Sequence, residues 1–106
     1  MKNDQALQML GLASRARKLQ SGEFAVEKAV KSGTACLVLV ATDASENTKK
    51  LFRNMCAFYE VPFYEYRTKE ELGHCIGKEY RASLAVIDTG LAKTVEEKIK
   101  SSKTTE

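Results

Sequence analysis

Two aspartates stand directly after apolar segments, at positions where enzymes often keep acidic groups. Asp43 follows residues 35–41 and Asp88 follows residues 83–87. Carboxylates at strand ends can hold a metal ion or a phosphoryl group, but they also commonly cap the helix or turn that comes next. No glycine-rich phosphate loop and no lysine at a telling spacing accompanies them. We therefore favour capping over catalysis for both.

The single histidine and the three cysteines give no stronger sign of chemistry. His74 lies beside Cys75, but neighbouring residues of a helix point in different directions, and no Asp or Asn is placed to orient the imidazole ring. Cys36, Cys56 and Cys75 are an odd number at wide spacings, which indicates neither a disulfide framework nor a zinc site. We expect reduced, mostly buried thiols, no metal, no cofactor and no enzymatic activity.

Basic residues gather around a glycine near the N-terminus. Arg15, Arg17 and Lys18 precede Gly22, and Lys28 follows it by six residues on the polar side of a predicted helix. The free N–H groups at a helix start carry a partial positive charge, so a glycine there lets a phosphate backbone approach closely. A solvated helix face explains the same lysine equally well, and composition alone leaves both readings open.

A second candidate surface is the polar loop at residues 77–81. It contains two cations, Tyr80 and the acceptor Glu79, a combination that suits an unstacked base. An ordinary exposed connection is the alternative. Net charge is +3, but residues 1–53 hold nine Lys/Arg against five Asp/Glu, while residues 54–106 hold eight against nine. The first half is therefore the better candidate for an anionic partner.

Alternating periodicities define the elements that would position these groups. Helices are predicted at residues 4–17, 22–32, 48–59, 68–76 and 91–99, and strands at 19–21, 35–41, 63–66 and 83–87. Ser21 is placed to cap the second helix, and Thr68 with Glu71 predicts a capping box for the fourth. The strand at 35–41 is apolar on both faces, as a central strand covered by helices would be. The order indicates an α/β fold, a three-layer α/β/α sandwich with a small mixed, largely parallel sheet of about four strands.

Length and composition limit the remaining possibilities. A chain of 106 residues with 43% hydrophobic and 29% charged residues is one globular domain, which we place at residues 1–100, followed by a flexible tail at 101–106. The longest apolar run has seven residues, too few to span a bilayer. The first residues show no signal-peptide pattern. We expect a cytoplasmic protein without membrane contact.

The ordered motifs resemble those of the bacterial YlxQ-type proteins, members of the ribosomal protein family that binds kink-turn RNA. They are Ser21-Gly22-Glu23, Val26, Lys28-Ala29-Val30, Ser32-Gly33, residues 37–41 (LVLVA), residues 43–48 (DASENT), Val61-Pro62, Glu71-Leu72-Gly73, residues 76–79 (IGKE), and residues 85–88 (AVID) with Gly90. The likeness covers essentially residues 5–99. It implies an α/β/α sandwich that recognises an RNA stem bent sharply at an internal bulge, beside tandem sheared G·A pairs.

The resemblance also implies which residues touch the RNA. In that family the start of the second helix carries a Gly-x-Asn-Glu-x-x-Lys motif, whose ends match Gly22 and Lys28. Phe24 and Ala25 stand where the Asn and Glu would be, so the base-edge hydrogen bonds of that pair cannot form. Phosphate contact and shape should then supply more of the affinity. The expected RNA-binding residues are Arg17, Lys18, Ser21, Gly22, Glu23, Phe24, Ala25, Lys28, Asp43, Lys78, Glu79, Tyr80 and Arg81.

We therefore expect a non-enzymatic monomer that recognises kink-turn or similarly bent structured RNA, with ribosomal RNA and the ribosome as candidate partners, and that is either ribosome-associated or ribosomal-protein-like. The alternative is a protein-interaction module on the same fold with weak or lost RNA specificity. An exposed Phe24 at the start of the second helix would favour that alternative, because a solvent-facing aromatic side chain invites a partner.

Overall fold

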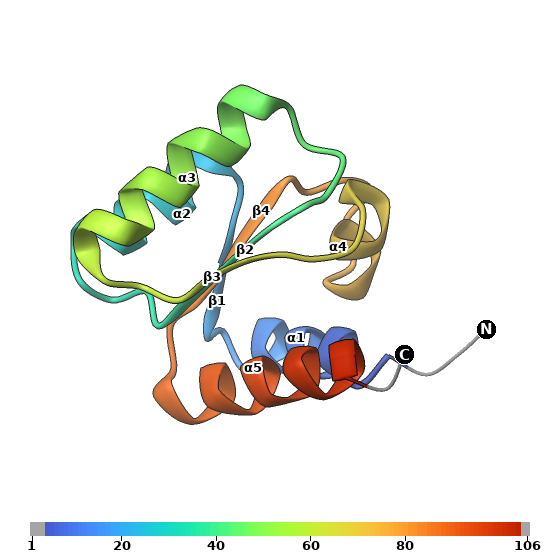
Figure 1. Ribbon diagram of the computed structural model, residues 1–106. Coiled ribbons are helices and arrows are strands. Elements are labelled where there is room, and N and C mark those ends of the chain that lie inside the picture. Colours follow the sequence, from blue (N-terminus) through green and yellow to red (C-terminus); the bar gives the residue numbers. More distant parts are fainter. Residues whose placement is uncertain (1–3, 105–106) are drawn as a thin grey trace.

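The computed structural model of the protein describes residues 4–104, and these form five helices around one four-stranded sheet (Figure 1). In chain order the elements are α1 (Gln5–Arg15), β1 (Leu19–Ser21), α2 (Glu23–Lys31), β2 (Leu37–Val40), α3 (Glu46–Tyr59), β3 (Phe63–Glu65), α4 (Lys69–Cys75), β4 (Ser83–Val86) and α5 (Thr89–Thr104). Each corresponds to an element that the periodicities predict. The α/β class and the four strands are confirmed.

The strands lie in the order β1-β4-β2-β3, and this order corrects the prediction of a largely parallel sheet. Only β2 and β3 pair in parallel, whereas β4 is antiparallel to both β1 and β2. The connection at residues 66–82 does not run back along the sheet, because after α4 the chain folds against that helix through the Lys78–Gly73 and Arg81–Lys69 backbone hydrogen bonds. The chain therefore enters β4 at the edge where β3 ended. Because this one reversed strand lies between β1 and β2, it makes two of the three pairings antiparallel.

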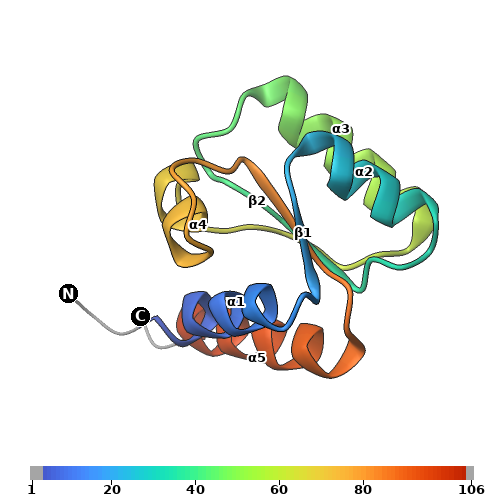
Figure 2. The same cartoon turned by 180° about the vertical axis from the view of Figure 1, so that it is seen from behind.

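Helices cover both faces of the sheet, as a three-layer sandwich requires. α2 and α3 lie on one face, and α1 and α5 pack together on the other, with α4 against α1 at one end (Figures 1 and 2). All four residues of β2 and all four of β4 are buried. Their apolar side chains belong to one hydrophobic core together with Leu10 from one helical layer and Phe52 from the other. The apolar run that predicted a central strand is thus the middle of the core.

The expected capping chemistry is present at α4, but Ser21 does not cap α2 and Asp43 does not cap α3. The Thr68–Glu71 capping box is present at α4, and the Ser45 hydroxyl accepts from the Thr48 amide at α3. The N-cap of α2 is Gly22, at φ 96° and without a side-chain cap, because Ser21 still belongs to β1. L side chains rarely adopt such a backbone conformation, which is why a glycine stands at this turn.

The C-terminal helix extends beyond the expected end of the domain. α5 runs to Thr104, so residues 101–104 of the predicted tail continue the helix, and residues 105–106 lie outside the described residues. The Asp88 carboxylate accepts from the Leu91 amide at the start of α5, 2.9 Å away, which confirms the capping role. All three cysteines are free; Cys56 is buried, and Cys36 and Cys75 are half-buried.

Candidate functional site

Three strands end, and the fourth begins, along one edge of the sheet. Ser21 pairs with Leu84, and Val40 pairs with both Ser83 and Glu65, so the ends of β1, β2 and β3 lie level with the start of β4. Residues 21–22, 41–45, 66–68 and 78–83 therefore meet there, and we call them the loop edge. Helices α2, α3 and α4 all begin at this edge. Their positive dipole ends consequently share one side of the molecule.

The two surfaces expected to contact RNA are joined at the loop edge. The Gly22 amide donates to the Ser83 carbonyl at 3.0 Å, and the Arg81 Nε donates to the Ser21 hydroxyl at 3.1 Å. A third bond runs from the Arg81 Nη1 to the Tyr80 carbonyl at 2.7 Å. Arg81 is half-buried and uses its guanidinium to fasten the loop to the start of α2. Its sequence position alone did not reveal this holding role.

The loop at residues 78–81 is seated on α4. The Lys78 amide donates to the Gly73 carbonyl at 2.9 Å, and the Arg81 amide donates to the Lys69 carbonyl at 3.0 Å. A Cβ on Gly73 would lie 2.8 Å from the Tyr80 Cα and N atoms, so only glycine allows this approach. Lys78, Glu79 and Tyr80 remain exposed, the last with 56% of its surface accessible. The loop is thus fixed in its backbone while its side chains face outward.

Asp43 lies at the loop edge but does not cap the next helix as expected, because the N-cap of α3 is Ser45. The Asp43 Oδ1 accepts from the Lys69 amide at 2.8 Å and so holds the start of α4. Asp88 follows β4, which runs in the opposite direction to β2, and it therefore lies at the opposite edge of the sheet. The two aspartates cannot form one acidic site. Among residues 4–104 no group of three His, Cys, Asp or Glu side chains is arranged to hold a metal ion.

Cys75 has the environment of an inert thiol. Its Sγ donates to the Leu72 carbonyl at 3.1 Å, and burial raises the pKa of the thiol to about 11. A catalytic cysteine needs a lowered pKa, so that the thiolate forms near neutral pH. His74 is exposed.

The outer part of α2 presents one paired and one unpaired lysine. Lys31 forms an ion pair with Glu27 at 2.7 Å, whereas Lys28 is exposed and has no ion pair within the described part of the chain. Phe24, in the first turn, has 81% of its surface exposed. A Cβ built on Gly22 would meet nothing within 4 Å, so among residues 4–104 no side chain fills the space next to this glycine.

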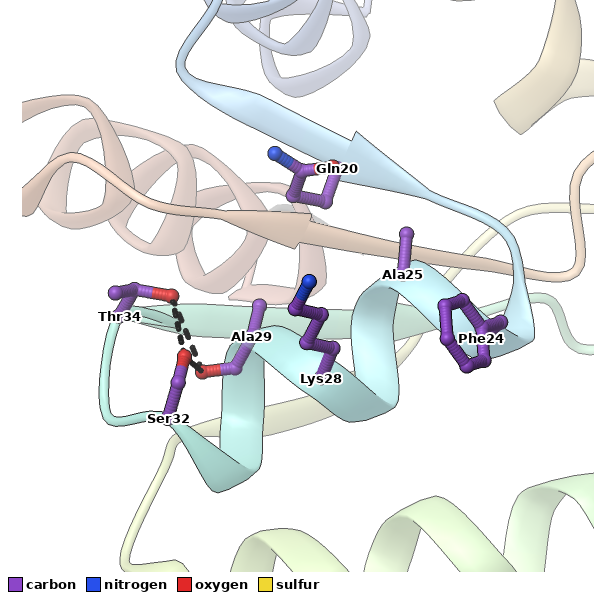
Figure 3. A pocket seen from close by; sticks show the side chains of 7 residues that line it. All are labelled: Gln20, Phe24, Ala25, Lys28, Ala29, Ser32 and Thr34. Atoms are coloured by element: carbon purple, nitrogen blue, oxygen red, sulfur yellow. Dashed lines mark hydrogen bonds between the residues drawn. The ribbon is translucent and has the colours of Figure 1, made fainter.

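Beside Lys28 the structure has a groove that sequence reasoning missed. It has a volume of about 330 Å³ and lies between α2 and β1 (Figure 3). The residues that line it are Gln20, Phe24, Ala25, Lys28, Ala29, Ser32 and Thr34. The sequence held one sign of it, since the small residues Ala25 and Ala29 are four apart and so share a face of the helix.

Arg17 and Lys18 are the two expected contacts that the structure leaves apart from the others. They precede β1, whereas Ser21 and Gly22 follow it, so the length of that strand separates them from the loop edge. The Lys18 carbonyl accepts from the Ile87 amide at the opposite end of β4. The other expected residues, namely Ser21, Gly22, Glu23, Phe24, Ala25, Lys28, Asp43, Lys78, Glu79, Tyr80 and Arg81, lie at the loop edge or on the first turns of α2.

Comparison with known proteins gives matches along most of the chain. The model of the ribosomal protein L7Ae/L30e/S12e/Gadd45 family matches residues 4–96. The RNA-binding protein YlxQ of Bacillus subtilis (strain 168) is 46% identical over 84 residues, which are 79% of this chain and 84% of that protein. The RNA-binding protein YlxQ of Enterococcus faecium is 40% identical over 94 residues, covering 89% of this chain and 90% of that protein.

Solved structures share the same architecture. A protein of unknown function from Bacillus halodurans C is 37% identical, with a TM-score of 0.90 over 92% of this chain and 99% of that chain. The Giardia lamblia 15.5kD RNA binding protein is 19% identical, with a TM-score of 0.77 over 98% of this chain and 92% of that chain. At this low identity the second likeness shows the fold alone. The YlxQ proteins are named for RNA binding, in agreement with the prediction of a non-enzymatic protein.

Proposed function

The chain belongs to the ribosomal protein L7Ae/L30e/S12e/Gadd45 family, and from this premise we propose that it is an RNA-binding protein that recognises a kink-turn or a similarly bent structured RNA. The observation that carries the proposal is the joining of the α2 start to the loop at residues 78–81. Through the Gly22–Ser83 and Arg81–Ser21 hydrogen bonds, these two segments present one continuous surface.

The start of α2 supplies groups that suit a phosphate backbone. The first N–H groups of a helix have no partner within the helix and carry a partial positive charge. Gly22 leaves the space beside them open, and the exposed Lys28 lies farther along the same helix. Lys78 adds a second exposed cation from the loop. Phosphates of the RNA would therefore lie against α2 and the loop together.

The same surface also carries the exposed carboxylates of Glu23 and Glu79. Because only a few cationic side chains are exposed on this surface, the protein should neutralise two or three phosphates there. Each neutralised phosphate contributes about −0.9 to the slope of log K against log salt, so the total slope should be about −2 to −3. Shape recognition of the bend must then supply much of the selectivity. Phe24 and Ala25 offer no side-chain hydrogen bonds to base edges.

The proposal extends to the setting in which the protein acts. Ribosomal proteins give the family its description, and we propose a bent segment of ribosomal RNA as the partner, bound by a monomer at the ribosome in the cytoplasm. Within residues 4–104 no helix is long and apolar enough to cross a membrane. Co-sedimentation of the protein with ribosomes on a sucrose gradient would support this setting, and recovery only at the top of the gradient would contradict it.

The recognition itself is tested by titrating the protein into two RNAs at several salt concentrations. One is a kink-turn stem, and the other has its tandem G·A pairs replaced by Watson–Crick pairs. We expect tighter binding to the kink-turn stem and the shallow salt slope given above. Equal binding with a steep slope would mean nonspecific attachment. No binding to either RNA would remove the proposal and favour a protein-interaction module, whose exposed anchor would be Phe24.

A further inference from the structure

The groove between α2 and β1 has the size of a site for one small group. Its volume of about 330 Å³ lies at the lower end of the range of about 300–1,000 Å³ found for small-molecule pockets. The methyl groups of Ala25 and Ala29 line it from α2, and Gln20 lines it from β1 (Figure 3). A groove of this size accepts a single flat ring system but not a folded protein segment.

An aromatic ring stands at one end of this groove. Phe24 is 81% exposed although it is among the largest apolar side chains of the protein. Its phenyl ring lies beside the groove, near the turn that connects β1 to α2 (Figure 3). Exposed aromatic rings at nucleic-acid surfaces stack with unpaired bases, because every base has a π-face.

The charge of the lining suits a nucleotide. Lys28 is its one charged residue, and none of the residues that line the groove is acidic. In Figure 3 the Lys28 side chain extends from α2 toward Gln20, across the groove. At the other end the Ser32 and Thr34 hydroxyls both donate to the Ala29 carbonyl, at 3.3 and 3.2 Å. These two side chains are thereby held in place and close that end.

From these observations we infer that the groove is a subsite for one unpaired nucleobase of the bound RNA, stacked on Phe24, with its phosphate at Lys28. The inference deepens the proposed function and rests on it for the presence of RNA. By the resemblance to the YlxQ-type proteins, Phe24 and Ala25 stand where an Asn and a Glu would read base edges. Stacking in the groove replaces that reading with a contact that tolerates any base.

The test uses a kink-turn RNA in which single unpaired bases are replaced in turn by the fluorescent base 2-aminopurine. Stacking on an aromatic ring changes the fluorescence of this base, so the wild-type protein should alter the signal at one unpaired position. Phe24→Ala should abolish that change and weaken binding about tenfold, the scale of one lost base–aromatic stack. The salt slope should stay the same, because the phenyl ring carries no charge.

Two further variants keep the test specific. Ala25→Leu retains Phe24 and Lys28 but fills the groove, and it should reproduce the loss seen with Phe24→Ala. With an RNA that has an abasic residue at the responsive position, both variants should bind as tightly as the wild-type protein, because no base is then available to stack. Phe58→Ala is the matched control, since Phe58 is also exposed, at 79%, but lies on α3. It should leave affinity and fluorescence unchanged.

The outcomes separate this inference from the proposed function. If the wild type prefers the kink-turn RNA but Phe24→Ala and Ala25→Leu bind it unchanged, the subsite is overturned and the proposed function stands. If a single-stranded oligonucleotide gives the Phe24-dependent fluorescence change while the kink-turn preference is absent, the subsite is supported and kink recognition falls. If the wild type binds no RNA of any kind, both fall.

Discussion

The two lysines of α2 differ in their surroundings although only two residues separate them. Lys31 is paired with Glu27 at 2.7 Å, and this hydrogen bond, together with the charge of the carboxylate, raises the pKa of Lys31. Its charge is already compensated before any ligand arrives. Lys28 has no such partner within the described residues and faces the groove. Only Lys28 can offer its full charge to a phosphate.

We therefore predict that Lys28→Ala weakens RNA binding, and that it reduces the salt slope by about one, as expected for one lost phosphate contact. The loss should be similar for different RNA sequences, because phosphate contacts carry no sequence information. Lys31→Ala is the control and should have a clearly smaller effect. Filter binding at four or more salt concentrations measures both. Equal effects of the two substitutions would show that RNA does not approach the groove side of α2.

Helix α4 packs closely against the backbone of the loop that follows it. It is only seven residues long, and its Gly73 lies against the backbone of residues 79–80. Because backbone atoms form this contact, a larger residue cannot be accommodated by a side-chain rotation. The position of the loop at residues 78–81 thus depends on a buried glycine of α4.

Gly73→Ala should destabilise the protein by about 1–3 kcal/mol, the usual cost of forcing extra atoms into a closely packed site. This cost exceeds the gain of about 0.5–1 kcal/mol that alanine brings to a helix interior. Gly90→Ala is the matched control, since its Cβ would lie 3.5 Å from the Asp88 Oδ2, an ordinary contact. Urea unfolding should show a lower midpoint for the first variant only. A Gly73→Ala protein with wild-type stability and RNA binding would contradict this role for α4.

Local sequence patterns predicted the positions of helices and strands better than they predicted the relative directions of the strands. The sequence predicts the capping box at Thr68 and the buried strand before Asp43, because capping and burial depend on a few neighbouring residues. The reversal of β4 could not be predicted in this way, because it depends on how residues 78–81 fold back onto α4. Ser21 failed as a cap for a similar reason, since the register of β1 with β4 extends the strand to Ser21 itself. The spacing of residues in the sequence does not show these two features, because both depend on tertiary contacts.

The sequence predicted individual residues of the candidate site but not how the structure brings them together. Gly22, Lys28 and the loop at residues 78–81 were expected as contacts, but the groove beside Lys28 exists only because α2 packs against β1. The strand direction likewise decides that Arg17 and Lys18 lie away from the loop edge. No spacing rule gives such an arrangement, because it depends on the whole sheet.

At the scale of the molecule, two tyrosines tie the edge strand β3 to the helices on the α1–α5 face. The Tyr64 hydroxyl donates to Glu96 of α5 at 2.7 Å. The Tyr66 hydroxyl donates to both Asp4 carboxylate oxygens, at 2.9 and 3.0 Å, just before α1. Burial and these hydrogen bonds raise the pKa of Tyr64 to about 12 and also raise the pKa of Tyr66. Both links require the protonated phenol.

This arrangement predicts a loss of stability in alkaline solution. Unfolded tyrosines release their protons near pH 10, while the folded Tyr64 keeps its proton to about pH 12. The unfolded state therefore binds fewer protons in this range, and the free energy of unfolding should fall as pH rises from about 10 through 12. Buried Cys56, with its pKa raised to about 11, begins the decline near pH 9.

Urea unfolding measured from pH 8 to 12 checks this dependence. Tyr64→Phe should make the decline above pH 10 shallower, whereas Phe58→Ala on the exposed side of α3 should leave its slope unchanged. An identical decline in Tyr64→Phe and the wild type would show that this tyrosine is not a source of the alkaline instability.

The central claim is that the loop edge fits RNA that is sharply bent. It is tested most directly by the ratio of two dissociation constants, measured at one ionic strength, for a kinked stem and for a straight duplex of equal length and charge. Because both RNAs offer the same number of phosphates, their ratio isolates the contribution of shape. We predict that the kinked stem binds about tenfold more tightly, a difference of about 1.4 kcal/mol. A ratio of one would contradict the claim.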